Sequence, residues 1–358
     1  MLYKMLVRPA LLQLDPEEAH ERALWMTAWL GRSRIARDAL RALFTVEDGR
    51  LRQTVCGIDF PNPVGLGAGY DKNAVGTGLW PSLGFGFVEI GSVTARAQPG
   101  NPPPRLFRLV EQRALINRMG FNNDGAEAIA GRVPPPPHPI PLGVNIGKNR
   151  DVDLAQAAAN YAAALEPFRD RADFFVINVS SPNTPGLRKL QDRELLDDLL
   201  ANVVGGRGSR RAGPPAHGSA ETPIFLKLAP DLTFEQIDDA LALVEKHRVD
   251  GVVATNTTID HPTPPEGGLS GAPLRARATE CVRHIRRQTR GRLSIIGVGG
   301  IFSAADAYEK IRAGASLVEV WTGMIYEGPG LARDINRGLL ALLDRDGFSS
   351  IAAAVGAE

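Results

Sequence analysis

The sequence predicts an α/β protein built on a (β/α)8 barrel, the TIM barrel, preceded by an N-terminal helical extension. Short apolar runs recur from residue 51 onward, helical patterns follow most of them, and residues 1–50 are helical without such runs. The runs are continuous rather than alternating, which is typical of strands buried on both faces. The eight expected strands cover residues 64–68, 87–90, 140–146, 174–179, 224–228, 251–255, 293–298 and 317–320.

Helical patterns separate these strands, as the crossover connections of parallel strands require. The expected helices cover residues 123–131, 153–168, 190–204, 233–247, 275–289, 303–313 and 330–345. A doubly wound open sheet is the alternative, but no Gly-x-Gly-x-x-Gly motif follows the first strand. The proline run 134–137 and the segment 205–222, rich in Gly, Arg, Pro and Ser, predict surface loops.

The N-terminal extension begins its main helix at a strong start signal. Asp15 suits the N-cap, Pro16 the first helical position, and Glu18 follows three residues after the cap. The segment 23–30 is apolar nearly all the way round, and Gly31 ends the helix. We expect this helix to cover a larger apolar surface or to lie on a membrane.

A second helix in the extension carries an apolar stripe beside basic residues. The stripe is formed by Ile35, Ala36, Ala39, Leu40, Leu43 and Phe44, with Arg34, Arg37 and Arg41 off it. Such a pair of helices caps a large core or lies on a membrane surface.

Composition excludes several classes of protein. The 358 residues carry 41 basic and 40 acidic side chains, a net charge of +1, so no global charge favours nucleic acid as a partner. Two cysteines cannot build a disulfide scaffold, and no run of about 18 apolar residues predicts a transmembrane helix. The basic start runs into an acidic turn, so we expect no signal peptide.

In a (β/α)8 barrel, reactive groups lie at the carboxyl ends of the strands. Amides, hydroxyls and two lysines follow these strands here, whereas histidine is absent and carboxylates are nearly so. We therefore expect no catalytic metal and no glycosidase. Asn and Thr side chains suit a planar ligand with carbonyl and N–H groups, and Gly299, Gly300, Thr322 and Gly323 follow the strands that commonly bind phosphate.

Five motifs at these positions resemble the dihydroorotate dehydrogenase family in order and spacing, over roughly residues 1–345. They are Ala68-Gly69-Tyr70-Asp71-Lys72-Asn73, Asn117-Arg118-Met119-Gly120-Phe121-Asn122-Asn123, Asn178-Val179-Ser180-Ser181-Pro182-Asn183-Thr184, Gly267-Gly268-Leu269-Ser270-Gly271 and Ile296-Gly297-Val298-Gly299-Gly300-Ile301. Members are FMN-containing barrels of pyrimidine biosynthesis. The helical extension, and Ser181 where class 1 enzymes carry cysteine, resemble the quinone-reducing, membrane-associated class 2.

The resemblance implies that (S)-dihydroorotate is oxidised to orotate. Ser181 would be the general base at C5, hydride would pass from C6 to N5 of FMN, and Thr184 and Phe121 would lie on a proton relay. The implied substrate-binding residues are Lys72, Asn117, Arg118, Met119, Gly120, Phe121, Asn178, Asn183, Asn256 and Thr257. The implied FMN-binding residues are Ala68, Gly69, Tyr70, Asp71, Lys72, Ser92, Asn145, Asn178, Lys227, Thr255, Gly271, Gly300, Trp321 and Thr322.

The resemblance also implies a quinone path lined by His20 and Arg108, one FMN per subunit, and a monomer on the cytoplasmic side of a bacterial cell membrane. Residues 1–50 would then give access to the membrane and the quinone, and residues 51–358 would form the FMN-binding catalytic domain. Two residues depart from the usual family pattern, Trp321 in place of Tyr and Ser92 in place of Thr.

Three other functions remain open at this stage. One is a soluble relative that reduces fumarate or NAD, which lacks support because no cysteine-rich segment is present. Another is a non-redox phosphate-binding barrel such as an aldolase with Lys227 as the Schiff-base nucleophile. The third is a membrane-bound scaffold without catalysis. A bound flavin would exclude the last two.

Overall fold

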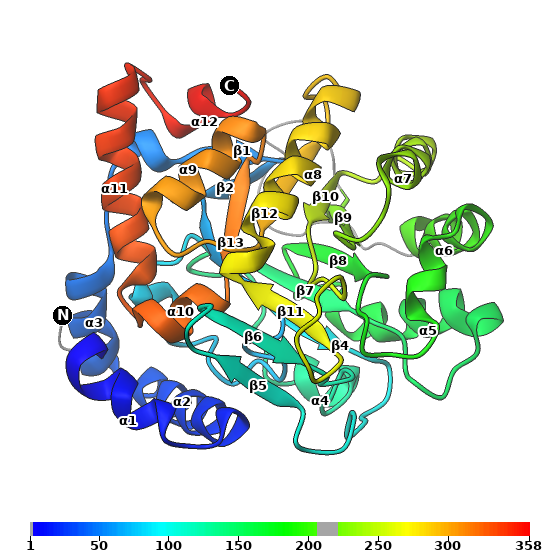
Figure 1. Ribbon diagram of the computed structural model, residues 1–358, viewed down its shortest axis with the longest axis horizontal. Coiled ribbons are helices and arrows are strands. Elements are labelled where there is room, and N and C mark those ends of the chain that lie inside the picture. The colour runs from blue at the N-terminus through cyan, green and yellow to red at the C-terminus, as the bar shows by residue number, and fades with distance from the viewer. Residues whose placement is uncertain (1–2, 206–220) are drawn as a thin grey trace.

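Eight parallel strands close into a barrel in the computed structural model, which describes residues 3–205 and 221–358 (Figure 1). The order around the barrel is β10, β12, β13, β3, β4, β7, β8 and β9, so the first strand pairs with the last. The strands are β3 (Val64–Leu66), β4 (Phe87–Val93), β7 (Leu142–Ile146), β8 (Phe174–Asn178), β9 (Ile224–Leu228), β10 (Gly251–Ala254), β12 (Ser294–Val298) and β13 (Leu317–Val320). All eight predicted strands are confirmed, with ends shifted by up to three residues.

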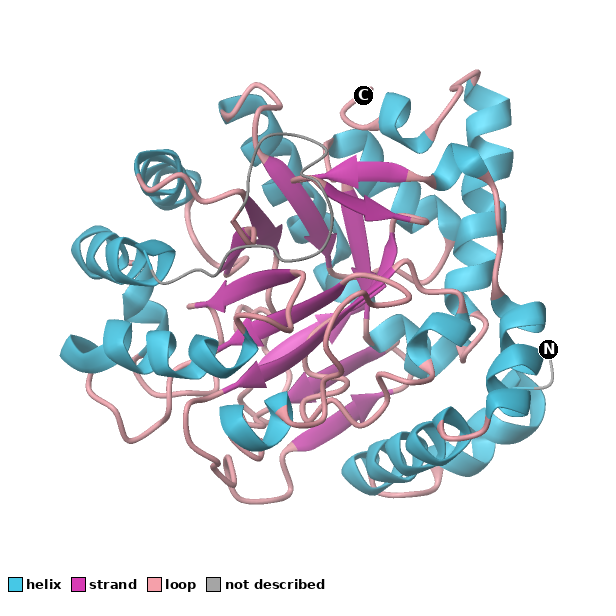
Figure 2. Ribbon diagram, turned by 180° about the vertical axis from the view of Figure 1, so that it is seen from behind, coloured by secondary structure: helices cyan, strands magenta, loops and turns pink. Residues whose placement is uncertain are grey.

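Helices surround the barrel, as the view from behind in Figure 2 shows. They are α4 (Ala126–Ala130), α5 (Ala157–Leu165), α6 (Arg193–Gly205), α7 (Phe234–Lys246), α8 (Arg275–Gln288), α9 (Ala304–Ala313) and α11 (Leu331–Asp346). Each coincides with a predicted helix. The short helices α10 (Thr322–Glu327) and α12 (Ile351–Ala354) were not predicted, because each is too brief to show a helical period.

The barrel interior is apolar at the amino-terminal ends of the strands. The rings of Phe87, Phe174 and Phe225 meet edge to face at this level. The hairpin of β1 (Gln53–Val55) and β2 (Ile58–Phe60) packs Val55, Ile58 and Phe60 against them and closes this end. Within the barrel, the opposite end is therefore the one where a ligand can bind.

A small antiparallel sheet stands beside the carboxyl-terminal ends of the barrel strands. Its strands are β5 (Leu106–Leu109), β6 (Ala114–Asn117) and β11 (Gly268–Gly271), with β6 in the middle. The sequence analysis did not predict this sheet, because its strands are four residues long and β11 is half glycine. The sheet brings Asn117 opposite Gly268 and so joins two of the recognised motifs.

The predicted helical extension is confirmed as η1 (Tyr3–Val7), α1 (Arg8–Leu12), α2 (Pro16–Gly31) and α3 (Arg34–Phe44). Asp15 caps α2 by accepting from the backbone N–H groups of Glu17 and Glu18. Figure 1 shows α2 alongside β5 and α1 next to α2, at one side of the barrel.

Two arginines anchor the extension, Arg105 directly before β5 and Arg108 within it. The guanidinium of Arg105 donates to Glu17 at 2.7 and 2.9 Å, and both side chains are largely buried. Arg108 donates to the backbone carbonyls of Leu11, at 2.8 Å, and Leu14. The extension is thus fixed to the barrel by charge-assisted hydrogen bonds.

Two absences concern only the residues that the structure describes. In these ranges, no helix is long and apolar enough to cross a membrane, and no cluster of His, Cys, Asp and Glu could hold a metal ion. The predicted loop at 134–137 lies outside the helices and strands. The predicted loop at 205–222 falls almost wholly on residues 206–220, outside the described ranges.

Candidate active site

A cavity opens at the carboxyl-terminal ends of the barrel strands, with a volume of about 1130 Å³ including solvent at its mouth. Most of the predicted site residues line it. They are His20, Ala68, Gly69, Lys72, Ser92, Asn117, Met119, Gly120, Phe121, Asn178, Ser181, Asn183, Lys227, Thr255, Asn256, Thr257, Gly271, Gly300, Trp321 and Thr322. Residues from almost the whole length of the chain are thus brought to one place.

Six predicted residues do not line the cavity: Tyr70, Asp71, Arg108, Arg118, Asn145 and Thr184. Asp71 is buried and accepts from Val75 and Gly76 N–H and from the indole of Trp80, so it holds the loop after β3 in shape. Thr184 is also buried, and its hydroxyl has no hydrogen-bond partner among the described residues.

A chain of hydrogen-bonded polar side chains crosses the base of the cavity. The amide of Asn178, at the end of β8, donates to the hydroxyl of Ser92, at 2.9 Å, and to the carbonyl of Asn145, at 3.1 Å. Asn256 donates to the carbonyl of Asn178 at 3.2 Å and to Ser180 at 3.0 Å. Each member fixes the orientation of the next, so the donors and acceptors that face the cavity are preorganised.

Ser181 is buried in the cavity wall, on the loop after β8. Its hydroxyl accepts from the backbone N–H of Asn183 at 3.3 Å. The Asn183 amide donates to the carbonyl of Asn117 on β6 at 2.7 Å, and Asn117 donates to Gly268 on β11. The loop that carries Ser181 is therefore held against the small sheet.

Lys72 and His20 lie at the side of the cavity that faces the extension. Burial lowers the pKa of Lys72 to about 8, although Glu17 opposes the shift. Burial also lowers the pKa of His20 to about 3, and the nearby Lys72 ammonium adds to this effect. His20 is therefore neutral, and its ring meets Tyr70 at 5.1 Å and Trp321 at 6.5 Å between centroids.

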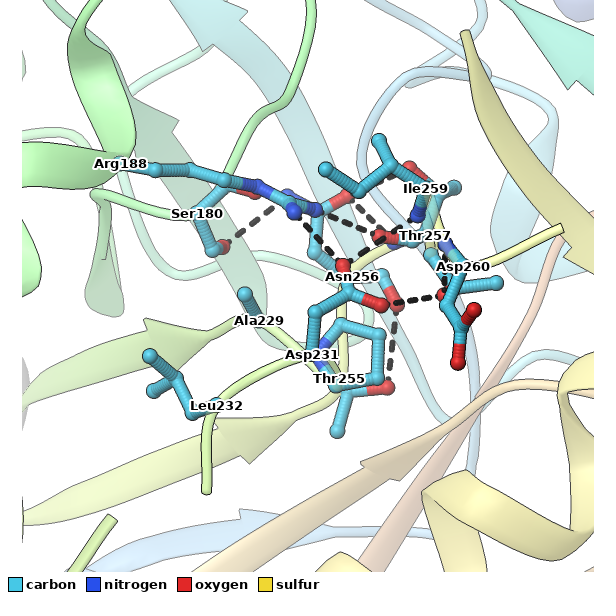
Figure 3. A network of polar contacts seen from close by, with 12 residues as sticks. Ser180, Arg188, Ala229, Asp231, Leu232, Thr255, Asn256, Thr257, Ile259 and Asp260 are labelled. Carbon is cyan, nitrogen blue, oxygen red and sulfur yellow. Dashed lines mark hydrogen bonds and ion pairs between the residues drawn. The ribbon is translucent and has the colours of Figure 1, made fainter. Parts of the chain in front are cut away.

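Arg188 is a site residue that the sequence analysis missed. It lies on the 3-10 helix η6 (Leu187–Gln191) and donates to the backbone carbonyls of Ser180, at 3.0 Å, and Thr257, at 2.9 Å (Figure 3). Its third bond, at 2.6 Å, goes to Asp231, which also accepts from the Thr258 hydroxyl. Arg188 thus joins the loop that carries Ser181 to the loops after β9 and β10.

The interior also contains two carboxyl groups that the sequence analysis overlooked. Glu89 of β4 and Glu319 of β13 lie 3.3 and 3.9 Å from the ammonium of Lys227. The expectation that the site has almost no carboxylate was therefore wrong. Both glutamates stand inside strands, whereas the reactive groups of a (β/α)8 barrel are expected after them.

Comparison with known proteins identifies the family. A family model described as dihydroorotate dehydrogenase matches residues 50–343. The chain belongs to the dihydroorotate dehydrogenase family. Two proteins named dihydroorotate dehydrogenase (quinone) are each 48% identical: the one from Gloeobacter violaceus aligns over 99% of this chain and 98% of its own, and the one from Natronomonas pharaonis over 100% and 99%.

Solved structures of dihydroorotate dehydrogenase support the assignment of the fold. The crystal structure of the Eimeria tenella enzyme in complex with ferulenol has a TM-score of 0.86 and 37% sequence identity. The match covers 96% of this chain and 95% of that one. The ligand-free crystal structure from the same organism has a TM-score of 0.85 over 96% of this chain. A match over 96% of this chain is longer than the barrel of residues 51–358 and therefore extends into the helical extension.

Proposed function

We propose that this chain oxidises (S)-dihydroorotate to orotate in pyrimidine biosynthesis, with FMN as hydride acceptor and a membrane quinone as the final electron acceptor. The observation that carries this proposal is the buried Ser181 hydroxyl, in the wall of a cavity that also holds two lysines and the network of asparagines. Two proteins named dihydroorotate dehydrogenase (quinone) align with this chain over nearly their whole length.

The residues around the cavity fit FMN. Ser92, Asn178, Thr255 and Thr322 offer hydroxyl and amide groups, and Lys227 offers a cation at the base. Asn145 supports this set from behind. Gly271 and Gly300 have φ of 99° and 70°, a left-handed backbone that leaves the cavity wall without side chains there. When bound, FMN accepts a hydride and passes the electrons on.

The residues of the chain supply the acid–base chemistry. We assign to Ser181 the removal of a proton from C5 of dihydroorotate. A serine hydroxyl needs an acceptor for its own proton, and the buried Thr184 hydroxyl, which no described residue satisfies, is available to bind a water molecule on that path. Lys72 holds the substrate carboxylate, and Asn117 and Asn183 hold its amide groups.

The quinone half of the proposal concerns the extension. Trp25, Met26 and Trp29 on α2 are 69%, 50% and 59% exposed, although they are large apolar side chains. We propose that this surface lies on the cytoplasmic face of the membrane and that the quinone reaches the flavin past His20 and Arg108. We further propose a monomer with one FMN per subunit.

Two alternative functions lose support. An aldolase mechanism needs Lys227 as a neutral amine, but the Glu89 carboxylate, 3.3 Å from its ammonium, raises its pKa despite its burial. A soluble enzyme that uses fumarate or NAD has no need of the exposed tryptophans on α2. Anaerobic oxidation of dihydroorotate with quinone, fumarate and NAD, compared side by side, tests the proposal. A colourless protein, or turnover only with fumarate or NAD, would contradict it.

Lys72 gives the reaction a pH dependence. The ammonium form binds the substrate carboxylate, and it is lost as pH rises through about 8, the pKa to which burial lowers Lys72. We expect kcat/KM for dihydroorotate to fall tenfold per pH unit above this value. The Lys72→Gln variant should be weak at every pH and lack this decline. An identical decline in both would show that another group titrates.

Arg188 is predicted to position Ser181. The Arg188→Ala variant removes the hydrogen bond to the loop that carries Ser181 and the ion pair with Asp231. Flavin reduction by dihydroorotate should therefore slow about 10- to 100-fold. Reoxidation by quinone should not change. Arg188→Lys should recover only part of the rate, because an ammonium cannot bond three acceptors in the same plane.

The matched control is Arg193→Ala, which breaks an exposed pair with Asp239 at 3.3 Å. Stopped-flow measurement of the two half-reactions checks the prediction. If Arg188→Ala slows both half-reactions equally, or behaves like Arg193→Ala, Arg188 has no positioning role.

A further inference from the structure

Three ionisable side chains meet inside the barrel, between its apolar base and the cavity. Glu89, Lys227 and Glu319 come from β4, β9 and β13, and their side chains are 0%, 7% and 0% exposed. The ammonium of Lys227 lies 3.3 Å from Oε1 of Glu89 and 3.9 Å from Oε2 of Glu319. Two buried carboxyl groups thus share one cation.

The two carboxyl groups have unequal partners. Oε1 of Glu89 accepts from Lys227 and, at 2.7 Å, from the amide of Asn145. No group in the described ranges donates to Oε2 of Glu89 or to either oxygen of Glu319. Burying an ionised carboxylate without donors is costly, so the ionised form is supported at Glu89 and unsupported at Glu319.

The two carboxyl groups flank the same ammonium, at 3.3 and 3.9 Å, which brings them close enough for a hydrogen bond between them. Two carboxylates cannot form a hydrogen bond, because neither carries a proton, whereas a carboxylic acid and a carboxylate can. One proton between them would satisfy an otherwise unpartnered oxygen on each residue. It would also reduce the charge of the trio from −1 to zero.

The described residues around Glu319 offer no other charge that could stabilise two anions. Its neighbours in register are Val298 of β12 and Gly65 of β3, and Gly67, directly after β3, leaves its carboxyl group the space that a Cβ would fill. Below lie the phenylalanine rings. Above lies the cavity, which Glu319 lines. Among the described residues, the charges that act on Glu319 are Glu89 and Lys227.

We propose that Glu89 and Glu319 share one proton, which Glu319 carries, so that Glu319 is a neutral carboxylic acid in the wall of the flavin pocket. The part that concerns the flavin rests on the proposed function. Burial raises the pKa of Glu319 well above its usual range, and the carboxylate of Glu89 adds to this effect. Lys227 and Glu89 then form the ion pair of the trio, and Glu319 contributes no charge beside the cofactor.

A ¹³C NMR spectrum tests the protonation directly. Protein labelled at the side-chain carboxyl carbon of glutamate and loaded with flavin should give, at pH 7, one buried signal at the position of a carboxylic acid. The Glu319→Gln variant should lack it, while Glu280→Gln, which removes an exposed carboxylate on α8, should retain it. In Glu89→Gln the signal should move to the carboxylate position, because Glu319 becomes the counter-ion of Lys227.

The flavin provides a second measurement. Because glutamine is neutral like the acid, Glu319→Gln should change the reduction equilibrium of the bound flavin less than tenfold, about 30 mV for a two-electron couple. If Glu319 is ionised, its replacement removes a buried negative charge and shifts the equilibrium toward the reduced flavin by more than tenfold. A larger change, or the absence of an acid signal, would overturn the proposal.

Stability supplies a third measurement. Above pH 4.5, the usual pKa of glutamate, the unfolded chain releases a proton that the folded protein keeps at Glu319, so stability falls as pH rises toward the raised pKa. Glutamine at position 319 cannot titrate. The melting temperature of Glu319→Gln relative to the native protein should therefore rise with pH above 4.5, and the difference between the two should be constant below pH 4.5. A constant difference would contradict the shared proton.

These outcomes separate the two proposals. An acid signal in a protein that does not oxidise dihydroorotate refutes the proposed function and leaves the shared proton in place. Oxidation of dihydroorotate by a protein that lacks the acid signal supports the proposed function and refutes the shared proton. If Glu319→Gln does not fold, titration of the native protein decides, because the proposal requires a glutamate signal that is still protonated at pH 7.

Discussion

Replacing Ser181 with alanine is expected to leave the flavin bound and to slow its reduction by dihydroorotate at least about a hundredfold, the usual effect of losing a general base. Alanine fits the buried position and removes only the hydroxyl, which accepts from Asn183. Anaerobic stopped-flow measurement of flavin bleaching gives the rate. Reoxidation by quinone should be unchanged, because it does not use the base.

Two further variants, one at Ser181 and one at the neighbouring Ser180, serve as comparisons. Ser181→Cys should retain more activity than Ser181→Ala, since a thiol can also accept the proton. Ser180→Ala removes a hydroxyl that contacts Asn178 and Asn256 instead, so it should have a smaller effect. Near-normal reduction in Ser181→Ala would remove Ser181 from the role of base.

Deletion of residues 1–45 is expected to abolish reduction of long-tailed quinones and to weaken binding to liposomes. The deletion removes the exposed Trp25 and Trp29, and with them His20 at the side of the cavity. Reduction of the flavin by dihydroorotate should fall much less, because the residues assigned to that substrate follow the extension. Full-length rates with long-tailed quinones would show that these helices are only a structural cap.

A milder variant avoids exposing the barrel. Trp25→Gln with Trp29→Gln changes only side chains that stack on one another at 6.5 Å and face outward, so the helix and its anchors to Arg105 and Arg108 remain. Liposome binding and the KM for long-tailed quinones should worsen, and activity with a short, water-soluble quinone should persist. The exposed pair Glu18→Gln with Arg22→Gln, on the same helix, is the control.

The barrel could be predicted because its strands are buried on both faces, which leaves continuous apolar runs such as Ile224–Leu228. The small sheet could not, since its middle strand β6 pairs with β11, some 150 residues away, and β5 pairs only with β6. The stripe on α3 was only partly buried: Leu40 and Phe44 pack on the core, whereas Ile35 is 83% exposed. A stripe shows that a face is apolar, but not what covers it.

The site was predictable where its residues follow strands and form motifs, as Ser181 and Lys72 do. Glu89 and Glu319 escaped because a charged residue inside an apolar run marks no site until the strands close and place it beside Lys227. Arg188 escaped because its acceptors are mainly backbone carbonyls, which no sequence pattern identifies.

The hairpin β1–β2 has a consequence for inhibitors. Since Val55, Ile58 and Phe60 close the amino-terminal end of the barrel, no small molecule can reach the cavity from that side. A compound that acts by filling the cavity must therefore enter where the natural ligands enter. Selective compounds have to exploit the cavity wall beside the extension, where Trp321 and His20 give this chain an aromatic surface. We expect resistance mutations to gather at this wall and to spare the closed end.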